Sequence, residues 1–115
     1  MNVIVVVSDT CRRDHLGCYG NEWMHTESLD RLASQSVIFD NCYAASLPTL
    51  PHRADCFLGK LSCPSFGWGP MPREGSTLAE LLTKAGYTTQ LIHDTPHLTA
   101  KGHYYERGFQ GYHWV

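Results

Sequence analysis

The sequence has little excess charge and no long apolar run, and both absences narrow the kind of protein it encodes. Its 115 residues include nine basic and eleven acidic side chains, a formal net charge of −2. This balance argues against a nucleic-acid-binding arm or a polybasic membrane anchor. The longest apolar run, Val3–Val7, is too short to cross a bilayer and lacks the basic leader of a signal peptide. We therefore expect a small cytoplasmic domain that binds neither nucleic acid nor membranes.

The cysteines do not follow the spacing of a known disulfide or metal-binding motif. The chain has five cysteines, an odd number, and none of them forms a Cys-x-x-Cys pair. Without an export signal, this pattern favours reduced thiols over a disulfide framework, and we expect all of them, Cys63 included, to be free. The same spacing disfavours a structural zinc ribbon or another Cys/His metal-binding domain.

Three segments have the pattern of β-strands. Residues 3–7 are β-branched and apolar on both faces, which favours a buried parallel strand over a half-exposed antiparallel one. Residues 37–39 and 87–92 are the other two. The tail at residues 95–115 is aromatic and rich in glycine, with no clear period. A surface loop is expected at residues 62–75, which are rich in proline and glycine.

Helices are predicted between these strands from their end signals. One follows Thr26 as its N-cap, and a second runs from the Thr49–Pro51 region to Gly59. A third follows Thr77, whose spacing to Glu80 fits a capping box, and ends near a glycine at position 86. The alternation predicts an α/β fold with a mostly parallel sheet sandwiched by helices.

Polar side chains stand where ligands of a parallel sheet bind, beyond the carboxyl ends of strands. Asp9 follows the first predicted strand, His93 and Asp94 follow a later one, and Thr49 lies at a predicted helix start. A carboxylate can bind a hard divalent cation, a hydroxyl beside it can become a nucleophile, and a helix N-terminus favours an anion. Arg53 lies one helical turn after Thr49, where its guanidinium would hold that side chain or an oxyanion. These residues predict a metal-assisted site for a tetrahedral anion.

Four blocks of sequence, in order, resemble the sulfatase branch of the alkaline phosphatase superfamily. They are NVIVVVSDTCRRDHLGCYGN at 2–21, TESLDRLA at 26–33, TLPHR at 49–53 and TLAELLTKAGYTT at 77–89. The third falls where the family carries its Cys/Ser-x-Pro-x-Arg nucleophile signature. Because family members are several times longer, the resemblance implies that residues 1–115 are the N-terminal part of a sulfatase-like α/β domain whose remainder is absent.

The resemblance also implies roles for individual residues. Asp9 becomes a ligand of a divalent metal (Ca²⁺, Mn²⁺, Zn²⁺ or Mg²⁺), Thr49 the nucleophile beside that metal, and Arg53 its positioning residue. Sulfatases convert Cys or Ser at the nucleophile position to formylglycine, but a threonine cannot yield that aldehyde. Relatives with an unmodified Thr or Ser act on phosphoesters or phosphonates through a covalent phospho-enzyme. The implied activity is therefore hydrolysis of small-molecule sulfate, phosphate or phosphonate esters, and the threonine favours phosphorus.

Two departures from the family pattern leave an alternative open. Thr10 stands where the family often has a second Asp, and the family Lys has become His93 or Asp94. His97 is the nearest match to the family histidine and a candidate oxyanion contact. The alternative is a non-catalytic, truncated or degenerate module that binds an anion without turnover. In either case we expect the isolated 115-residue chain to be inactive and to associate with itself through exposed sheet.

Overall fold

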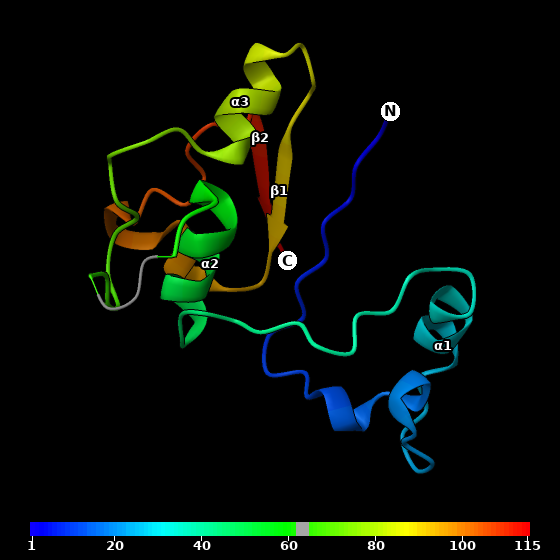
Figure 1. Cartoon of the computed structure of the whole chain (residues 1–115). Helices are drawn as coiled ribbons and strands as arrows, with labels where there is room; N and C mark the ends of the chain where they lie inside the picture. The colour runs from blue at the N-terminus through cyan, green and yellow to red at the C-terminus, as the bar shows by residue number, and fades with distance from the viewer. Residues whose placement is uncertain (62–64) are drawn as a thin grey trace. The chain divides into compact units, whose positions relative to one another are not determined.

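The computed structural model describes residues 1–61 and 65–115, with the backbone alone at Lys101. Cys63 and the first residues of the predicted loop at 62–75 lie outside this range. The chain divides into two compact units, Met1–Cys42 and Tyr43–Val115. Figure 1 shows their helices and the pair of strands in the second unit. Among the described residues, no helix combines the length and apolar character needed to cross a membrane.

The first unit is built on short helices: η1 (Arg13–His15), η2 (Gly17–Tyr19) and α1 (Glu27–Ala33). Thr26 occupies the N-cap position of α1, as predicted, but its hydroxyl does not cap the helix. That hydroxyl accepts a hydrogen bond from Gly17 N at 2.8 Å and donates to Asp30 Oδ2 at 3.0 Å. Asp30 Oδ1 also accepts from Cys18 N at 2.7 Å. The side chains at the start of α1 therefore join it to η2.

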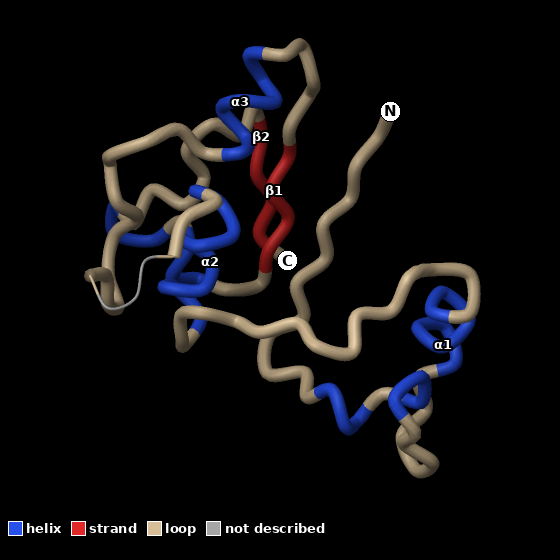
Figure 2. The backbone as a smooth tube through the Cα atoms, viewed as in Figure 1, coloured by secondary structure: helices blue, strands red, loops and turns tan. Residues whose placement is uncertain are grey.

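The strands predicted at residues 3–7 and 37–39 are wrong for the described structure. Both segments lie outside any helix or β-ladder and are drawn as loop in Figure 2. Their apolar side chains are open to solvent, with exposed fractions of 88% at Ile4, 84% at Val6 and 69% at Phe39. A strand needs a neighbour for its backbone hydrogen bonds, and the described residues of the first unit contain no strand that could supply one. Both sequences have β propensity, but a strand forms only when it is paired.

Helices α2 and α3, which lie in the second unit, confirm the predicted end signals. Helix α2 (Thr49–Leu58) is followed by Gly59 in the left-handed region, at φ 61°. Helix α3 (Leu78–Lys84) starts at the capping box of Thr77 and Glu80, in which each side chain bonds the other's backbone N–H. Hydrogen bonds from Gly86 N to Thr83 O and from Tyr87 N to Leu82 O form the Schellman pattern after its last turn. The end signals in the local sequence therefore indicate where both helices begin and end.

Strands β1 (Gln90–His93) and β2 (Gly111–Trp114) pair in parallel, with Gln90 opposite Gly111 and His93 opposite Trp114. The mixed α/β class and the parallel pairing are therefore confirmed. Strand β1 starts three residues later than predicted, and β2 lies in the tail for which the sequence indicated no period. The connection between them contains η3 (Pro96–Leu98) and η4 (Ala100–Gly102).

The core of the second unit surrounds the inner side of α2. Its buried members come from α2, the following loop and the β1–β2 connection: Leu50, Ala54, Met71, Leu98 and Tyr105. Tyr105 has no exposed surface, and its ring contacts Phe57 edge to face at 6.2 Å. Its hydroxyl donates to Leu50 O at 3.0 Å, so this side chain both fills the core and bonds the first turn of α2.

Gly108 lies in the connection between β1 and β2, packs against the start of α3 and has φ +90°. Its carbonyl accepts hydrogen bonds from Thr83 Oγ1 at 3.0 Å and Thr89 Oγ1 at 3.2 Å. A Cβ at this position would lie 2.6 Å from Glu80 N and 2.8 Å from Thr77 Oγ1. The capping box of α3 therefore packs directly against a backbone that has room for glycine alone.

The buried phenol of Tyr105 predicts a loss of stability at alkaline pH. Burial raises the pKa of Tyr105 to about 12, whereas a tyrosine in an unfolded chain titrates near pH 10. Below about pH 10 both states keep the proton and the contribution of the neutral phenol is fully present. Between about pH 10 and 12 only the unfolded chain ionises, which costs about 2 to 3 kcal/mol of folding free energy.

The measurement is urea unfolding of the chain and of Tyr105→Phe at about pH 9, 10, 11 and 12. The two proteins share every other ionisable group, so the difference between the two pH profiles isolates Tyr105. We expect the free energy of unfolding of the parent to fall more steeply than that of Tyr105→Phe. Parallel profiles would show that the phenol of Tyr105 is not protected by folding.

Candidate active site

Thr49 is the first residue of α2 and is half-buried, with Pro48 at the N-cap. No side chain caps this end of the helix, because proline has none to offer. The first backbone N–H groups of an α-helix have no partner within the helix, and the helix dipole favours negative charge there. Arg53 follows one turn later and is only 8% exposed. The second unit therefore places a hydroxyl and a guanidinium on the first turns of one helix, as the sequence predicted, and it buries the guanidinium, which the sequence did not predict.

Asp9 lies in the first unit, at a turn that ends the extended segment of residues 1–8, and it is exposed. Thr10 beside it has φ 55°, in the left-handed region that β-branched residues rarely occupy. Strain of this kind is concentrated at functional sites in proteins. Because Asp9 and Thr49 belong to different units, their convergence on one cation stays a prediction.

His93 ends β1 and is buried, while Asp94 after it is exposed. The imidazole Nε2 of His93 lies 3.4 Å from Thr99 Oγ1. Its Nδ1 is buried and has no hydrogen-bond partner in the described part of the chain. An orphaned polar atom at the carboxyl end of a parallel strand is a candidate ligand contact. The sequence placed this histidine beyond the end of a predicted strand and named it as one of two replacements for the family lysine, but nothing in the local pattern indicates its burial.

His97, the predicted oxyanion contact, is exposed in η3. Its ring packs edge-on against Trp68, with centroids 5.3 Å apart, and its carbonyl accepts a hydrogen bond from His103. These contacts involve neither Thr49 nor Arg53. The role of His97 in binding an oxyanion stays a prediction.

A thiol and an imidazole meet on α2, a pair that the sequence analysis did not single out. Cys56 Sγ lies 3.6 Å from His52 Nε2, one turn apart on the helix. Partial burial of the sulfur raises the pKa of the Cys56 thiol; Asp55 raises it further and Arg53 opposes the shift. The thiolate is the reactive form of cysteine, so this pair is unsuited to nucleophilic catalysis near neutral pH. The i, i+4 spacing of His and Cys was the signal available in the sequence.

The cysteines behave as expected where the structure describes them. Cys11, Cys18, Cys42 and Cys56 are free thiols. Within residues 1–61 and 65–115, no three His, Cys, Asp or Glu side chains gather as a metal site. Asp9 and Thr49 offer hard oxygen donors that suit Ca²⁺, Mg²⁺, Mn²⁺ or Zn²⁺, but two donors are fewer than such ions require.

The family model named Sulfatase matches residues 1–113. The chain belongs to the sulfatase family. An N-acetylglucosamine-6-O-sulfatase of Bacteroides thetaiotaomicron is 34% identical over an alignment of 94 residues that covers 79% of this chain and 17% of that relative. An arylsulfatase of Clostridium perfringens is 34% identical over an alignment of 118 residues, gaps included, that covers 97% of this chain and 23% of the relative. A human steryl-sulfatase is 34% identical over an alignment of 105 residues, gaps included, that covers 79% of this chain and 18% of the relative.

This sulfatase-family chain therefore spans about a fifth of the length of the curated relatives it matches. No solved structure gives a significant match. The predicted family is confirmed, and with it homology to hydrolases of sulfuric esters. The residues that would carry catalysis in this chain, and the activity of the chain itself, are matters of proposal.

Proposed function

We propose that this chain supplies the nucleophile part of a metal-dependent ester hydrolase, with Thr49 attacking phosphorus in a phosphodiester or phosphonate ester. The observation that carries the proposal is the start of α2. There, an uncapped helix N-terminus bears a threonine at the family's nucleophile position, followed one turn later by a buried arginine. A developing oxyanion would be stabilised by the positive end of the helix and by the guanidinium.

In the proposed reaction, Thr49 Oγ gives up its proton and attacks the phosphorus atom in line with the leaving alcohol. A bond forms between Thr49 Oγ and phosphorus, the bond from phosphorus to the leaving oxygen breaks, and the alcohol departs with its electron pair and a proton. Water then attacks the same phosphorus atom: a bond forms between the water oxygen and phosphorus, the bond from phosphorus to Thr49 Oγ breaks, the phosphate monoester or phosphonate leaves, and a proton from the water returns to Thr49 Oγ. Arg53 holds the non-bridging oxygens in both steps.

Asp9 and Thr49 would hold a divalent cation together with further ligands, because two donors do not fill its coordination shell. When bound, such an ion lowers the pKa of the hydroxyl and neutralises charge on the ester. Thr10 can add a hydroxyl or carbonyl oxygen from its strained turn. Formylglycine has no place in this proposal, because oxidation of a secondary alcohol gives a ketone.

A non-catalytic anion-binding module is the second candidate. It is favoured by Thr10 in place of the family's second Asp and by the absence of a lysine at positions 93–94. Both changes remove groups that would bind the cation or neutralise the transferred oxyanion. This candidate predicts anion binding without turnover.

The test is an assay of the protein expressed from the complete reading frame that encodes this chain. Its substrates are an aryl phosphodiester, an aryl phosphonate monoester and an aryl sulfate. We expect a phosphorus ester to be hydrolysed at least about tenfold faster than the sulfate, and EDTA to abolish turnover until Ca²⁺, Mn²⁺, Zn²⁺ or Mg²⁺ is restored. Turnover of the sulfate alone would contradict the phosphorus chemistry, and binding without turnover of any ester would favour the second candidate.

A further inference from the structure

A pocket of about 440 Å³ opens in the second unit between the loop at residues 71–76, helix α3 and the β1–β2 connection. This volume lies within the range of small-ligand sites. Thr49 and Arg53 are not among the lining residues, so the pocket is separate from the proposed nucleophile. Its lining is Met71, Arg73, Gly75, Ser76, Glu80, Lys84, Tyr104 and Arg107.

The pocket is cationic in a chain that is acidic overall. Three basic side chains and one carboxylate line it, whereas the formal net charge of the whole chain is −2. A fourth cation is adjacent: a Cβ on the lining residue Gly75 would lie 2.9 Å from Lys60 Nζ. Basic groups from four separate segments of sequence therefore surround one cavity, an arrangement that raises the local concentration of anions.

Arg107 and Glu80, which carry opposite charges in this pocket, already have structural roles. Arg107 donates to the carbonyls of Pro72, Arg73 and Gly75 at 3.2, 3.1 and 3.0 Å. Its Nε lies 3.5 Å from Glu80 Oε1, while Glu80 Oε2 accepts from Thr77 N. In the described part of the chain, by contrast, the side chains of Arg73 and Lys84 form no ion pair. They are available to a ligand.

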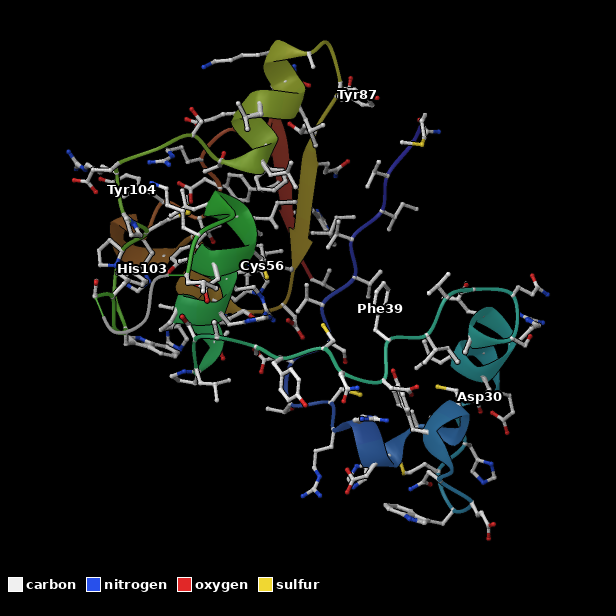
Figure 3. The ribbon with its side chains drawn as sticks, viewed as in Figure 1. Asp30, Phe39, Cys56, Tyr87, His103 and Tyr104 are labelled. Atoms are coloured by element: carbon white, nitrogen blue, oxygen red, sulfur yellow. The ribbon has the colours of Figure 1, made fainter. Side chains whose placement is uncertain are left out.

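Tyr104 adds an aromatic wall to the pocket (Figure 3). Its backbone has φ 62°, a left-handed conformation that bulky residues rarely adopt. The guanidinium carbon of Arg73 lies 5.7 Å from the centroid of the Tyr104 ring. The strained backbone thus holds a ring next to one of the two available cations, where it can contact an apolar ring face.

We propose that this pocket binds an anionic sugar, a pyranose that carries a sulfate or phosphate ester. The ester oxygens lie between Arg73 and Lys84, and the face of the sugar ring packs on Tyr104. The aromatic wall distinguishes such a ligand from a free inorganic anion, and the cations distinguish it from a neutral sugar. The inference does not depend on the proposed hydrolase, since it concerns binding away from Thr49 and requires no turnover.

The experiment is titration of the 115-residue chain at about 0.15 M ionic strength, so that nonspecific attraction is screened. The probes are glucose 6-sulfate, glucose 6-phosphate, sodium sulfate and glucose, and the readout is calorimetry or NMR shift changes. We expect at least one of the two esters to bind at least about tenfold more tightly than sodium sulfate, and glucose not to bind measurably. The esters' relative affinities identify which oxyanion the site prefers.

Variants locate the binding. Arg73→Ala and Lys84→Ala are each expected to weaken binding of the preferred ester about tenfold, whereas Arg31→Ala, an exposed arginine of α1, leaves it unchanged. Tyr104→Ala is expected to remove the advantage of the ester over sodium sulfate. Arg107 is left intact because it holds the loop at residues 72–75, and an unchanged near-UV spectrum checks the fold of each variant.

Equal binding of ester and sodium sulfate, or equal effects of Arg73→Ala and Arg31→Ala, would overturn the proposal. Thr49→Ala is expected to bind the ester as the parent does. The pocket proposal is therefore tested separately from the proposed hydrolase activity.

Discussion

Thr49→Ala is expected to reduce ester hydrolysis by the protein from the complete reading frame at least about 10³-fold, with little change in stability. The hydroxyl is the proposed nucleophile, and alanine removes it while preserving the start of α2. The kinetic parameters are measured with the preferred phosphorus ester, and the free energy of unfolding is measured in urea. Thr88→Ala, an exposed threonine outside the site, is the matched control and should retain parental kcat.

Two further substitutions at position 49 separate a nucleophile from a helix-capping or packing role. Thr49→Ser keeps a hydroxyl and is expected to stay within about tenfold of the parent. Thr49→Cys creates Cys-Leu-Pro-His-Arg, which fits the family's Cys-x-Pro-x-Arg signature. Co-expressed with the enzyme that makes formylglycine, this variant is expected to gain arylsulfatase turnover that the parent lacks. Hydrolysis by Thr49→Ala at the parental rate would refute the role of this hydroxyl.

Gly108→Ala is expected to destabilise the second unit by about 3 kcal/mol or more. The new methyl group would lie 2.5 Å from Glu80 Cγ and 2.6 Å from the backbone nitrogen of the same residue. Relief requires α3 to move, which would break the capping box and the bonds that Thr83 and Thr89 donate to the Gly108 carbonyl. The measurement is urea unfolding followed by circular dichroism.

Gly86→Ala is the matched control for this effect. Gly86 has φ +87°, nearly the same as Gly108, but no atom lies within 4 Å of a Cβ built there. It should show the backbone penalty alone, about 1 to 2 kcal/mol. If both variants lose the same stability, the close packing of Gly108 against Glu80 makes no contribution of its own.

The parts of the fold that the sequence predicted are those decided within a few residues. Thr77 and Glu80 cap α3 because both partners of each hydrogen bond lie within one turn. Gly59 ends α2 in a left-handed conformation for the same local reason. Thr26 shows the limit of this approach: its hydroxyl faces a competing partner nine residues earlier, Gly17 N, and the expected cap bond is lost.

The strands were harder to predict because their existence depends on partners far away in the sequence. Residues 3–7 have strong β propensity, yet the described residues of their unit offer no neighbouring strand. Residues 111–114 have a weak pattern, Gly-Tyr-His-Trp, but they pair with β1 and so form a strand. In both cases the presence of a neighbouring strand decides whether the segment becomes a strand, and the local sequence pattern does not predict that neighbour.

The candidate site also has features that local sequence predicts and features that depend on tertiary packing. The spacing of Thr49 and Arg53 is a property of one helix, and the structure places both on the first turns of α2. The burial of His93 and the gathering of Arg73, Lys84 and Arg107 around one pocket depend on tertiary packing of segments that have no common motif. The convergence of Asp9 with Thr49 also depends on tertiary packing, so their spacing in the sequence cannot establish it.

The parallel pairing of β1 with β2 has a consequence for synthesis on the ribosome. Strand β1 cannot acquire its partner until residues 111–114 have emerged from the exit tunnel, since the whole connection of residues 94–110 is translated in between. Helices α2 and α3 can form earlier from their own end signals. During that interval the nascent chain exposes an unpaired β1 edge, the period in which a chaperone would be most useful to it.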